Sequence, residues 1–408
     1  MAGYFPVVKR HQMQAASWSL LLLMVALQAW GQSPDTASLD AIAGQALFEK
    51  NWVQAPSSTR SSDGLGPHFS NRSCAACHPG GGRGSGPQSN TLQLNDPVYG
   101  LRLHPFSLAL VPREATLEWV QNQPPKAGFT LNGQSGWHPA ISTLAYGDLH
   151  SALSVRQAPS LLGLGLLESV PTAALIALAD PEDENKDGIS GRVAWGKQTD
   201  QGLQAGRFGW KAGTASLASQ AAQALSLDIG ISNPQFPDPW GDCSATQTAC
   251  RDLATRTASR VGQEAGLEAN QTVLDLLVAY LRSLQAPAPL TGPQTAHNLF
   301  QRIGCANCHV PELPSSGGPV LAYTDLLLHD MGPELDDGLA EGAADSAEWR
   351  TAPLWSLPAA GPFLHDGRAA SLDEVIALHG GEAGQSRAAY RQLNESDKAS
   401  LLVLLLGL

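Results

Sequence analysis

The sequence predicts a mainly α-helical protein built from two similar units, the first of which carries long loop insertions. The first observation behind this is a repeated motif, since Cys-x-x-Cys-His occurs at 74–78 and again at 305–309. The second is that helical segments frame each copy, a short one ending in Leu-Phe before it and a longer apolar one closing the unit. We therefore expect an N-terminal unit over residues 32–290 and a C-terminal unit over residues 291–408.

Length and composition agree with a folded chain of more than one domain. The chain has 408 residues, which at roughly 150 residues per domain predicts two or three domains. Charged residues make up 15% and hydrophobic residues 43% of the chain, which excludes a disordered protein. The formal net charge of −12 argues against nucleic acid as a partner, because such binding needs a basic surface.

The first 31 residues have the pattern of a secretory signal peptide. A basic segment at 9–11 precedes an apolar run at 19–27, and the small residues Ala29 and Gly31 then stand where a signal peptidase cleaves. We expect cleavage near Gly31 and export to the periplasm, with an uncleaved N-terminal anchor as the alternative. The rest of the chain has no run of about 18 apolar residues, so we expect no stable membrane insertion after cleavage.

Four helical segments and one linker are expected around the repeated motifs. Residues 43–48 and 296–300 precede the two motifs and end in Leu-Phe on an apolar face. Residues 273–284 place apolar side chains at helical spacing, and residues 396–408 begin with a capping serine and are rich in leucine. The Pro- and Ala-rich residues 285–293 are the predicted linker between the units.

The repeated motif is typical of the covalent attachment of haem c. In each copy the two thiols would form thioethers to the porphyrin vinyl groups, and the histidine would bind the iron. The residues are Cys74, Cys77 and His78 for the first haem, and Cys305, Cys308 and His309 for the second. A redox dithiol or half of a zinc site is the alternative, which two copies in an exported chain disfavour. The units thus have the plan of class I cytochrome c domains, with two covalently bound haem c groups as cofactors.

The two remaining cysteines, Cys243 and Cys250, stand seven residues apart in a polar stretch. In an oxidising compartment this spacing predicts a disulfide that closes a small loop, and free thiols are the alternative.

One acidic loop of the first unit resembles the first half of a calcium-binding loop. Asp183, Asn185 and Asp187 have the required spacing, and Gly188 follows them. The twelfth position is Ala194, where such loops carry a bidentate glutamate. Two interpretations remain open, a Ca²⁺ site or a solvated acidic turn.

The sixth ligand decides whether a c-type haem only transfers electrons or also reacts. Two strong protein ligands leave electron transfer alone, whereas an open position can bind peroxide or oxygen. Cleavage near Gly31 leaves Met331 as the one remaining methionine, so at most one haem can have His/Met ligation. His104 or His138 bound to the first iron would make the protein an electron carrier.

Several short segments occur in an order that is typical of one family. They are Gly64-Leu-Gly-Pro67, Arg156-x-Ala-Pro159, Gly206-Arg-Phe-Gly-Trp210, Gly230-Ile-Ser-Asn-Pro234, Leu328-His-Asp-Met-Gly332, Arg350-Thr-Ala-Pro-Leu354 and Phe363-Leu-His-Asp-Gly-Arg368. On these residues the chain resembles the dihaem oxidoreductases described as peroxidases or thiol oxidoreductases. These proteins are relatives of the bacterial dihaem cytochrome c peroxidases and of the dihaem enzyme that matures methylamine dehydrogenase.

The resemblance implies the sixth ligand of the second haem. In the family this ligand stands fourteen residues after the histidine of a His-Asp-Gly motif, as Met in the peroxidases and Tyr in the maturation enzyme. Here the position holds His379, which implies a bis-histidine haem with His309. Met331 is the alternative ligand. A histidine at the position where the peroxidases have methionine implies a lower reduction potential.

The resemblance also implies residues between and around the haems. Trp210, Leu217 and Gln220 keep the spacing of a family tryptophan that lies between the haems. Trp210 is thereby implied as an inter-haem relay, with core packing as the alternative, and Gln220 as a distal-pocket residue of the first haem. Phe236 stands where the family has a distal glutamate, so other acids are candidates for proton delivery. These candidates are Glu168, Glu114 and Asp228. The residues expected beside the second haem or its propionates are His329, His365 and Arg368.

Taken together, the signal peptide and the resemblance imply a periplasmic dihaem oxidoreductase that reduces hydrogen peroxide or another small oxidant. A small redox protein, a cytochrome c or a cupredoxin, would supply the electrons. The same haem groups could also take electrons from a substrate and oxidise it through a high-valent haem. The alternative from another class is a non-catalytic dihaem electron-transfer cytochrome.

Overall fold

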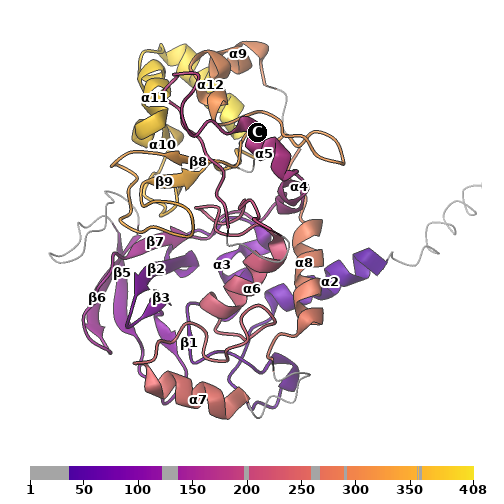
Figure 1. Ribbon diagram of the computed structural model, residues 1–408, viewed down its shortest axis with the longest axis vertical. Helices are drawn as coiled ribbons and strands as arrows, with labels where there is room; N and C mark the ends of the chain where they lie inside the picture. The colour runs from indigo at the N-terminus through magenta and orange to yellow at the C-terminus, as the bar shows by residue number, and fades with distance from the viewer. Residues whose placement is uncertain are drawn as a thin grey trace, which may run out of the picture.

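The computed structural model describes residues 36–121, 137–196, 202–258, 267–288, 292–355, 357 and 361–408. The expected signal peptide therefore lies outside the described residues. The C-terminal helices gather at one end of the molecule, and the strands of the first unit with α7 occupy the other (Figure 1). In the described part of the chain, no helix is long and apolar enough to cross a membrane.

Helices occur in both units. Those of the first unit are α2 (Thr36–Glu49), α3 (Cys74–Cys77), α4 (Leu164–Glu168), α5 (Thr172–Leu178), α6 (Leu217–Asp228), α7 (Thr248–Ala258) and α8 (Gln271–Ser283). Those of the second unit are α9 (Gln294–Arg302), α10 (Leu372–Leu378), α11 (Gly384–Arg391) and α12 (Glu395–Leu406). Short 3₁₀ turns lie at η1 (Arg60–Ser62), η2 (Pro79–Gly81), η3 (Pro87–Ser89), η5 (Cys305–Asn307) and η6 (Gly381–Ala383).

Antiparallel strands fill the insertion of the first unit, where the sequence predicted loops. The strands are β1 (His68–Phe69), β2 (Asn90–Asp96), β3 (Gly100–Arg102), β4 (Phe106–Ser107), β5 (Ala115–Gln121), β6 (Trp137–Leu144) and β7 (Ser154–Gln157). They form a β3-β2-β7 sheet and the pairs β5-β6 and β1-β4, and the second unit adds the pair β8 (Leu328–Asp330) and β9 (Glu348–Arg350). Along β2, Leu92 and Leu94 alternate with less buried residues and join a small core of their own, which is typical of a strand with one buried face. The mainly α prediction thus describes the helical framework and misses this β insertion.

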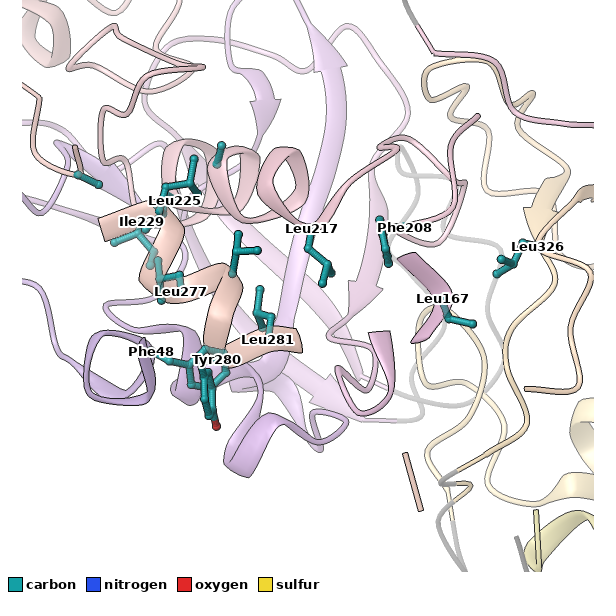
Figure 2. Close-up of a cluster of buried hydrophobic side chains, with 14 of the residues drawn as sticks. Phe48, Leu167, Phe208, Leu217, Leu225, Ile229, Leu277, Tyr280, Leu281 and Leu326 are labelled. Carbon is teal, nitrogen blue, oxygen red and sulfur yellow. The ribbon is translucent and has the colours of Figure 1, made fainter. Parts of the chain in front are cut away.

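The opening and closing helices of the first unit pack against each other. Asn270 caps α8, and its buried side chains meet α2, where the rings of Phe48 and Tyr280 lie 5.1 Å apart. A side chain at Gly44 would place its Cβ 2.0 Å from the Leu276 carbonyl oxygen, so glycine permits this close approach. Figure 2 shows the cluster that results, to which α6 contributes Leu225.

The second unit repeats this plan with α9 against α12. Its core holds Phe300 of α9 and Leu401 of α12. The cores do not divide cleanly at residue 290, because Leu326 and Trp355 belong to the core of the first unit. Figure 2 shows Leu326 within that cluster. The segment after the linker therefore helps to build both halves of the molecule.

Candidate haem-binding sites

The first Cys-x-x-Cys-His motif forms the short helix α3 and the residue after it. Ser73 caps the helix by accepting a hydrogen bond from the Ala76 amide at 3.2 Å. The Nδ1 atom of His78 lies 2.8 Å from the carbonyl oxygen of Pro159, which only accepts, so Nδ1 carries the proton. The Nε2 atom of His78 therefore keeps its lone pair for a metal.

The second motif follows α9 and has the same arrangement at its histidine. The Nδ1 atom of His309 lies 2.9 Å from the carbonyl oxygen of Tyr323, which again leaves Nε2 unprotonated. Burial lowers the pKa of His309 to about 4, and nearby His379 adds to this shift. The imidazole is thus neutral, as an iron ligand must be.

Three of the motif cysteines have raised pKa values. Burial raises the pKa of Cys74 to about 12, with further contributions from Cys77 and Asp228. Burial likewise raises the pKa of Cys77 and of Cys305 to about 12. Redox-active cysteines commonly have lowered pKa values, so these raised values do not favour the dithiol alternative.

His309 and His379 line the same largely apolar cavity. The space that the centre of a water molecule can reach inside it is about 240 Å³, and both histidines line it together with Met331. The Nδ1 atom of His379 lies 2.7 Å from the Val375 carbonyl oxygen, so its Nε2 also keeps a free lone pair. Two neutral imidazoles on one apolar cavity suit a porphyrin iron with two axial ligands.

Buried cations at the same cavity call for an anionic ligand. Arg83 and Arg350 line the cavity, and burial lowers the pKa of each to about 10. Among the residues that the structure describes, neither forms an ion pair with a carboxylate; Arg350 donates to the Gly209 carbonyl oxygen at 2.9 Å. The two propionates of a haem would balance these charges, so the residues fit the group.

Trp210 connects this cavity to the first motif. It lines the cavity, and its Nε1–H donates to the Gln157 carbonyl oxygen at 2.8 Å. Gln157 stands two residues before Pro159, whose carbonyl holds His78. Arg83 donates to the Gln157 side-chain oxygen at 2.9 Å. A short covalent and hydrogen-bonded path therefore joins Trp210 to the proximal histidine of the first site.

The model of the family described as "Di-haem oxidoreductase, putative peroxidase" matches residues 34–97 and 141–408. The chain belongs to this family. No curated protein matches the chain. The match leaves out residues 98–140, which hold β3, β4, β5 and the start of β6.

Two solved structures are similar to parts of this di-haem oxidoreductase. One is a MauG-like protein associated with microbial copper homeostasis, with 17% identity, a TM-score of 0.31 and coverage of 61% of this chain and 89% of that chain. The other is hydrazine synthase of Kuenenia stuttgartiensis, with 15% identity, a TM-score of 0.25 and coverage of 66% of this chain and 99% of that chain.

The residues expected around the second haem divide into two groups. His365 and His329 line the cavity of the di-haem oxidoreductase, and His365 stacks on Trp349 with the ring centres 3.8 Å apart. Arg368 instead donates to Asp366 at 2.6 Å and does not line the cavity. Arg83 and Arg350 are better placed for propionates, and sequence reasoning missed this role. The signal for Arg83 was its place five residues after His78.

The proton-delivery candidates lie in separate places rather than in one pocket. Near the start of α6, the Gln220 side-chain oxygen accepts from the Thr214 hydroxyl at 2.8 Å. Close by, Glu168 accepts from the Leu217 amide at 2.9 Å and from Arg282 at 2.7 Å.

The other two acids lie toward the far end of α6. Asp228 pairs with Arg102 at 3.2 Å, and its charge raises the pKa of Cys74 and Cys77, so it lies beside the first motif. Glu114 is fully buried between histidines and belongs to a different cluster.

Of the two histidines that could have bound the first iron, His104 has both ring nitrogens engaged elsewhere. The ring of His104 uses Nδ1 toward Glu114 at 2.9 Å and Nε2 toward the Leu227 carbonyl oxygen at 2.8 Å. His138 on β6 lies near Asp366 and Arg368 of the second unit, and burial lowers its pKa. His104 therefore has no nitrogen left for the first iron, whereas the buried Nε2 of His138 has no hydrogen-bond partner within the described residues, and ligation by His138 stays a prediction to be tested.

The loop expected to bind calcium and the disulfide are both described. Cys243 and Cys250 form a disulfide. In the exposed acidic loop, Asp183 accepts from the Gly188 amide at 3.2 Å and Asn185 from the Asp187 amide at 2.9 Å. These bonds shape the turn without an ion, and calcium binding stays a prediction.

Proposed function

We propose that this di-haem oxidoreductase is a periplasmic enzyme, cleaved near Gly31, that binds two haem c groups covalently and reduces hydrogen peroxide. The observation that carries this proposal is the asymmetry of the two sites. His309 and His379 line one cavity, whereas His104 has both ring nitrogens in other contacts and His138 lies near Asp366 and Arg368 of the second unit. A small electron-donor protein, a cytochrome c or a cupredoxin, would supply the electrons.

Bound haem supplies the one-electron chemistry and the position at which peroxide binds. Hydrogen peroxide takes two electrons and two protons to become two water molecules, and two haems hold one electron each. At the first site, the Pro159 carbonyl holds the proton of His78 on Nδ1 and leaves Nε2 as the atom that would hold the haem iron. At the second site, the Tyr323 and Val375 carbonyls do the same for His309 and His379.

Proton delivery is assigned to side chains at the two ends of α6. The Thr214 hydroxyl donates to the Gln220 oxygen and so turns the amide NH₂ of Gln220 outward as a donor. The charge of Asp228 acts on Cys74 and Cys77 of the first motif, and its side chain is partly exposed, so it can exchange protons with water.

A non-catalytic electron carrier is the second candidate, and electron paramagnetic resonance separates the two. We expect a high-spin ferric signal from the oxidised or half-reduced protein, and loss of this signal when hydrogen peroxide is added. Two low-spin signals that peroxide leaves unchanged in both states would overturn the peroxidase proposal and identify an electron carrier. If the enzyme instead oxidises a substrate through the haem, peroxide should abolish the high-spin signal in the same way, but the small donor protein should not be oxidised catalytically.

Replacing Trp210 with phenylalanine tests the route between the haems. We expect slower electron transfer from the second haem to the first, because the indole and its hydrogen bond to Gln157 are lost. The free energy of unfolding should fall by only about 1 kcal/mol, the usual value of one such bond. Stopped-flow absorbance after mixing the half-reduced protein with peroxide measures the rate.

Trp195→Phe is the matched control, since Trp195 is 39% exposed and does not line the haem cavity. Equal rates in Trp210→Phe and in the unmodified protein would contradict the relay and leave Trp210 as a packing residue.

A further inference from the structure

A second group of metal-ligating side chains lies away from the haem sites. It consists of His68 on β1, His104 after β3 and Glu114 before β5, which are 3%, 1% and 0% exposed. One ligand atom from each lies within 4.8 Å of the others. β1 lies at the end of the molecule opposite the C-terminal helices (Figure 1). His104 and Glu114 fall within residues 98–140, outside the match to the family.

Both imidazoles are oriented as in metal sites. The Nε2 atom of His68 lies 2.9 Å from the Pro112 carbonyl oxygen, and that of His104 lies 2.8 Å from the Leu227 carbonyl oxygen. Because carbonyl oxygens only accept, both Nε2 atoms carry protons. Both Nδ1 atoms lie next to Glu114; with a metal ion bound, both rings would be neutral and Nδ1 would be the ligand atom, whereas without one a protonated His104 donates from Nδ1 to Glu114. Metal-binding histidines are commonly held in this way by a carbonyl at the outer nitrogen.

The separations between the ligand atoms suit a tetrahedral ion. Zinc–nitrogen and zinc–oxygen bonds of about 2.0–2.1 Å place two ligand atoms roughly 3.3 Å apart. The His68 Nδ1 atom lies 3.3 Å from one Glu114 oxygen, and the His104 Nδ1 atom lies 2.9 Å from the other. The first separation equals this value, and the second is shorter by about 0.4 Å.

The charge of the cluster also calls for a cation. Within the described ranges, Glu114 has no ion pair with lysine or arginine, and its two pairs are with His68 and His104. A second buried carboxylate, Asp242, lies 3.9 Å from His104 Nε2. Gln247 donates its amide to Glu114 and holds the carboxylate in place. A buried carboxylate needs a cation close by, which is either a metal ion or a proton on an imidazole.

We propose that His68, His104 and Glu114 bind one divalent first-row transition-metal ion, with zinc as the ion that two imidazoles and one carboxylate favour. Neutral imidazole nitrogen and carboxylate oxygen are established zinc ligands, and water or the second carboxylate oxygen would complete the coordination. The ion would tie β1, the β insertion and the end of α6 together. Asp228, the residue after Leu227, lies beside the first haem motif, so the site would stiffen the support of that haem.

The test is zinc analysis of the full disulfide-bonded di-haem protein, produced in medium supplemented with zinc sulfate. We expect one zinc per chain, quantified against amino-acid analysis. X-ray absorption at the zinc edge, which the haem irons do not disturb, should show two imidazole nitrogens and carboxylate oxygen at about 2.0–2.1 Å.

Glu114→Gln should lose the zinc, and Gln247→Ala should weaken zinc binding about 10- to 100-fold in competition with a chelator. His150→Gln is the control, because His150 is exposed and outside the cluster.

Two results would overturn the proposal. The first is a folded protein that holds no zinc or other divalent metal beyond haem iron; Glu114 would then be paired with a protonated histidine. The second is zinc that shows no imidazole ligands or that persists in Glu114→Gln, which would be an adventitious ion. If Glu114→Gln fails to fold, the zinc-edge X-ray absorption spectrum of the unmodified protein decides whether imidazole nitrogens bind the ion.

Discussion

Replacing His379 with methionine is expected to raise the reduction potential of the second haem by on the order of 0.2 V, a quarter of the roughly 0.8 V that axial ligands span. Imidazole stabilises ferric iron more than a thioether does, so methionine favours the reduced state. The position permits the exchange because His379 follows α10 directly and lines the apolar cavity together with His309. Spectroelectrochemical titration of the Soret band measures the potential.

Two further variants separate His379 from the alternative ligand. His379→Ala should open the sixth position and convert the low-spin signal of the second haem to a high-spin one. Met331→Leu is the matched control, since Met331 lines the same cavity, and it should leave spin state and potential unchanged. The opposite pattern, with a response to Met331→Leu and none to His379→Ala, would assign the ligand to Met331.

The parts of the site that the sequence predicts are those encoded by neighbouring residues. A Cys-x-x-Cys-His motif keeps its thiols and its histidine within one helical turn, so its chemistry needs no tertiary structure to be predicted. The same holds for α8, whose buried Leu274, Leu277 and Leu281 repeat at helical spacing. Helix ends are predicted less well. The cap of α12 is Asn394, which accepts a hydrogen bond from the Asp397 amide, and not Ser396, which stands two residues later.

Interactions between distant segments explain what the sequence did not predict. The alternation in β2 is short, and its partner β7 begins about sixty residues later, so pattern alone favoured loops. The carbonyl that fixes His78 belongs to Pro159, 81 residues away. The burial of Arg83 and Arg350 is likewise invisible in sequence, where arginine predicts a solvated surface. Glu114 was assigned to proton delivery because nothing local shows that it folds between two histidines.

His329 is the basis of the last prediction, because it is a buried histidine between two acids. Its Nε2 lies 2.9 Å from Asp325 and its Nδ1 lies 2.7 Å from Glu382. Burial alone would lower the pKa of His329, but Asp325, Cys308 and Glu382 together raise it to about 12. The ring is therefore a cation that holds two carboxylates together at the edge of the haem cavity.

His329→Gln should lower the free energy of unfolding by about 3–5 kcal/mol, the usual cost of removing one partner from a buried ion pair. Because the folded pKa is raised above the unfolded value of about 6.5, the stabilisation is complete below that pH and is lost as the pH rises toward about 12. The difference in free energy of unfolding between the variant and the unmodified protein should thus be larger at pH 6 than at pH 9, because the decline begins near the unfolded-state pKa of about 6.5. Denaturant unfolding followed by Soret circular dichroism measures it.

The effect should also reach the neighbouring loop and the sixth ligand. Glu382 accepts from the Ser190 hydroxyl at 2.9 Å, which ties the acidic loop of the first unit to the second, and it stands three residues after His379. A glutamine at position 329 leaves Glu382 without a cation, so the loop contact and the position of His379 should both loosen. Ser190→Ala is the matched control, because it removes the loop contact and keeps the ion pairs, and its loss should be near 1 kcal/mol. Equal losses in both variants would mean that His329 contributes no more than a neutral hydrogen bond.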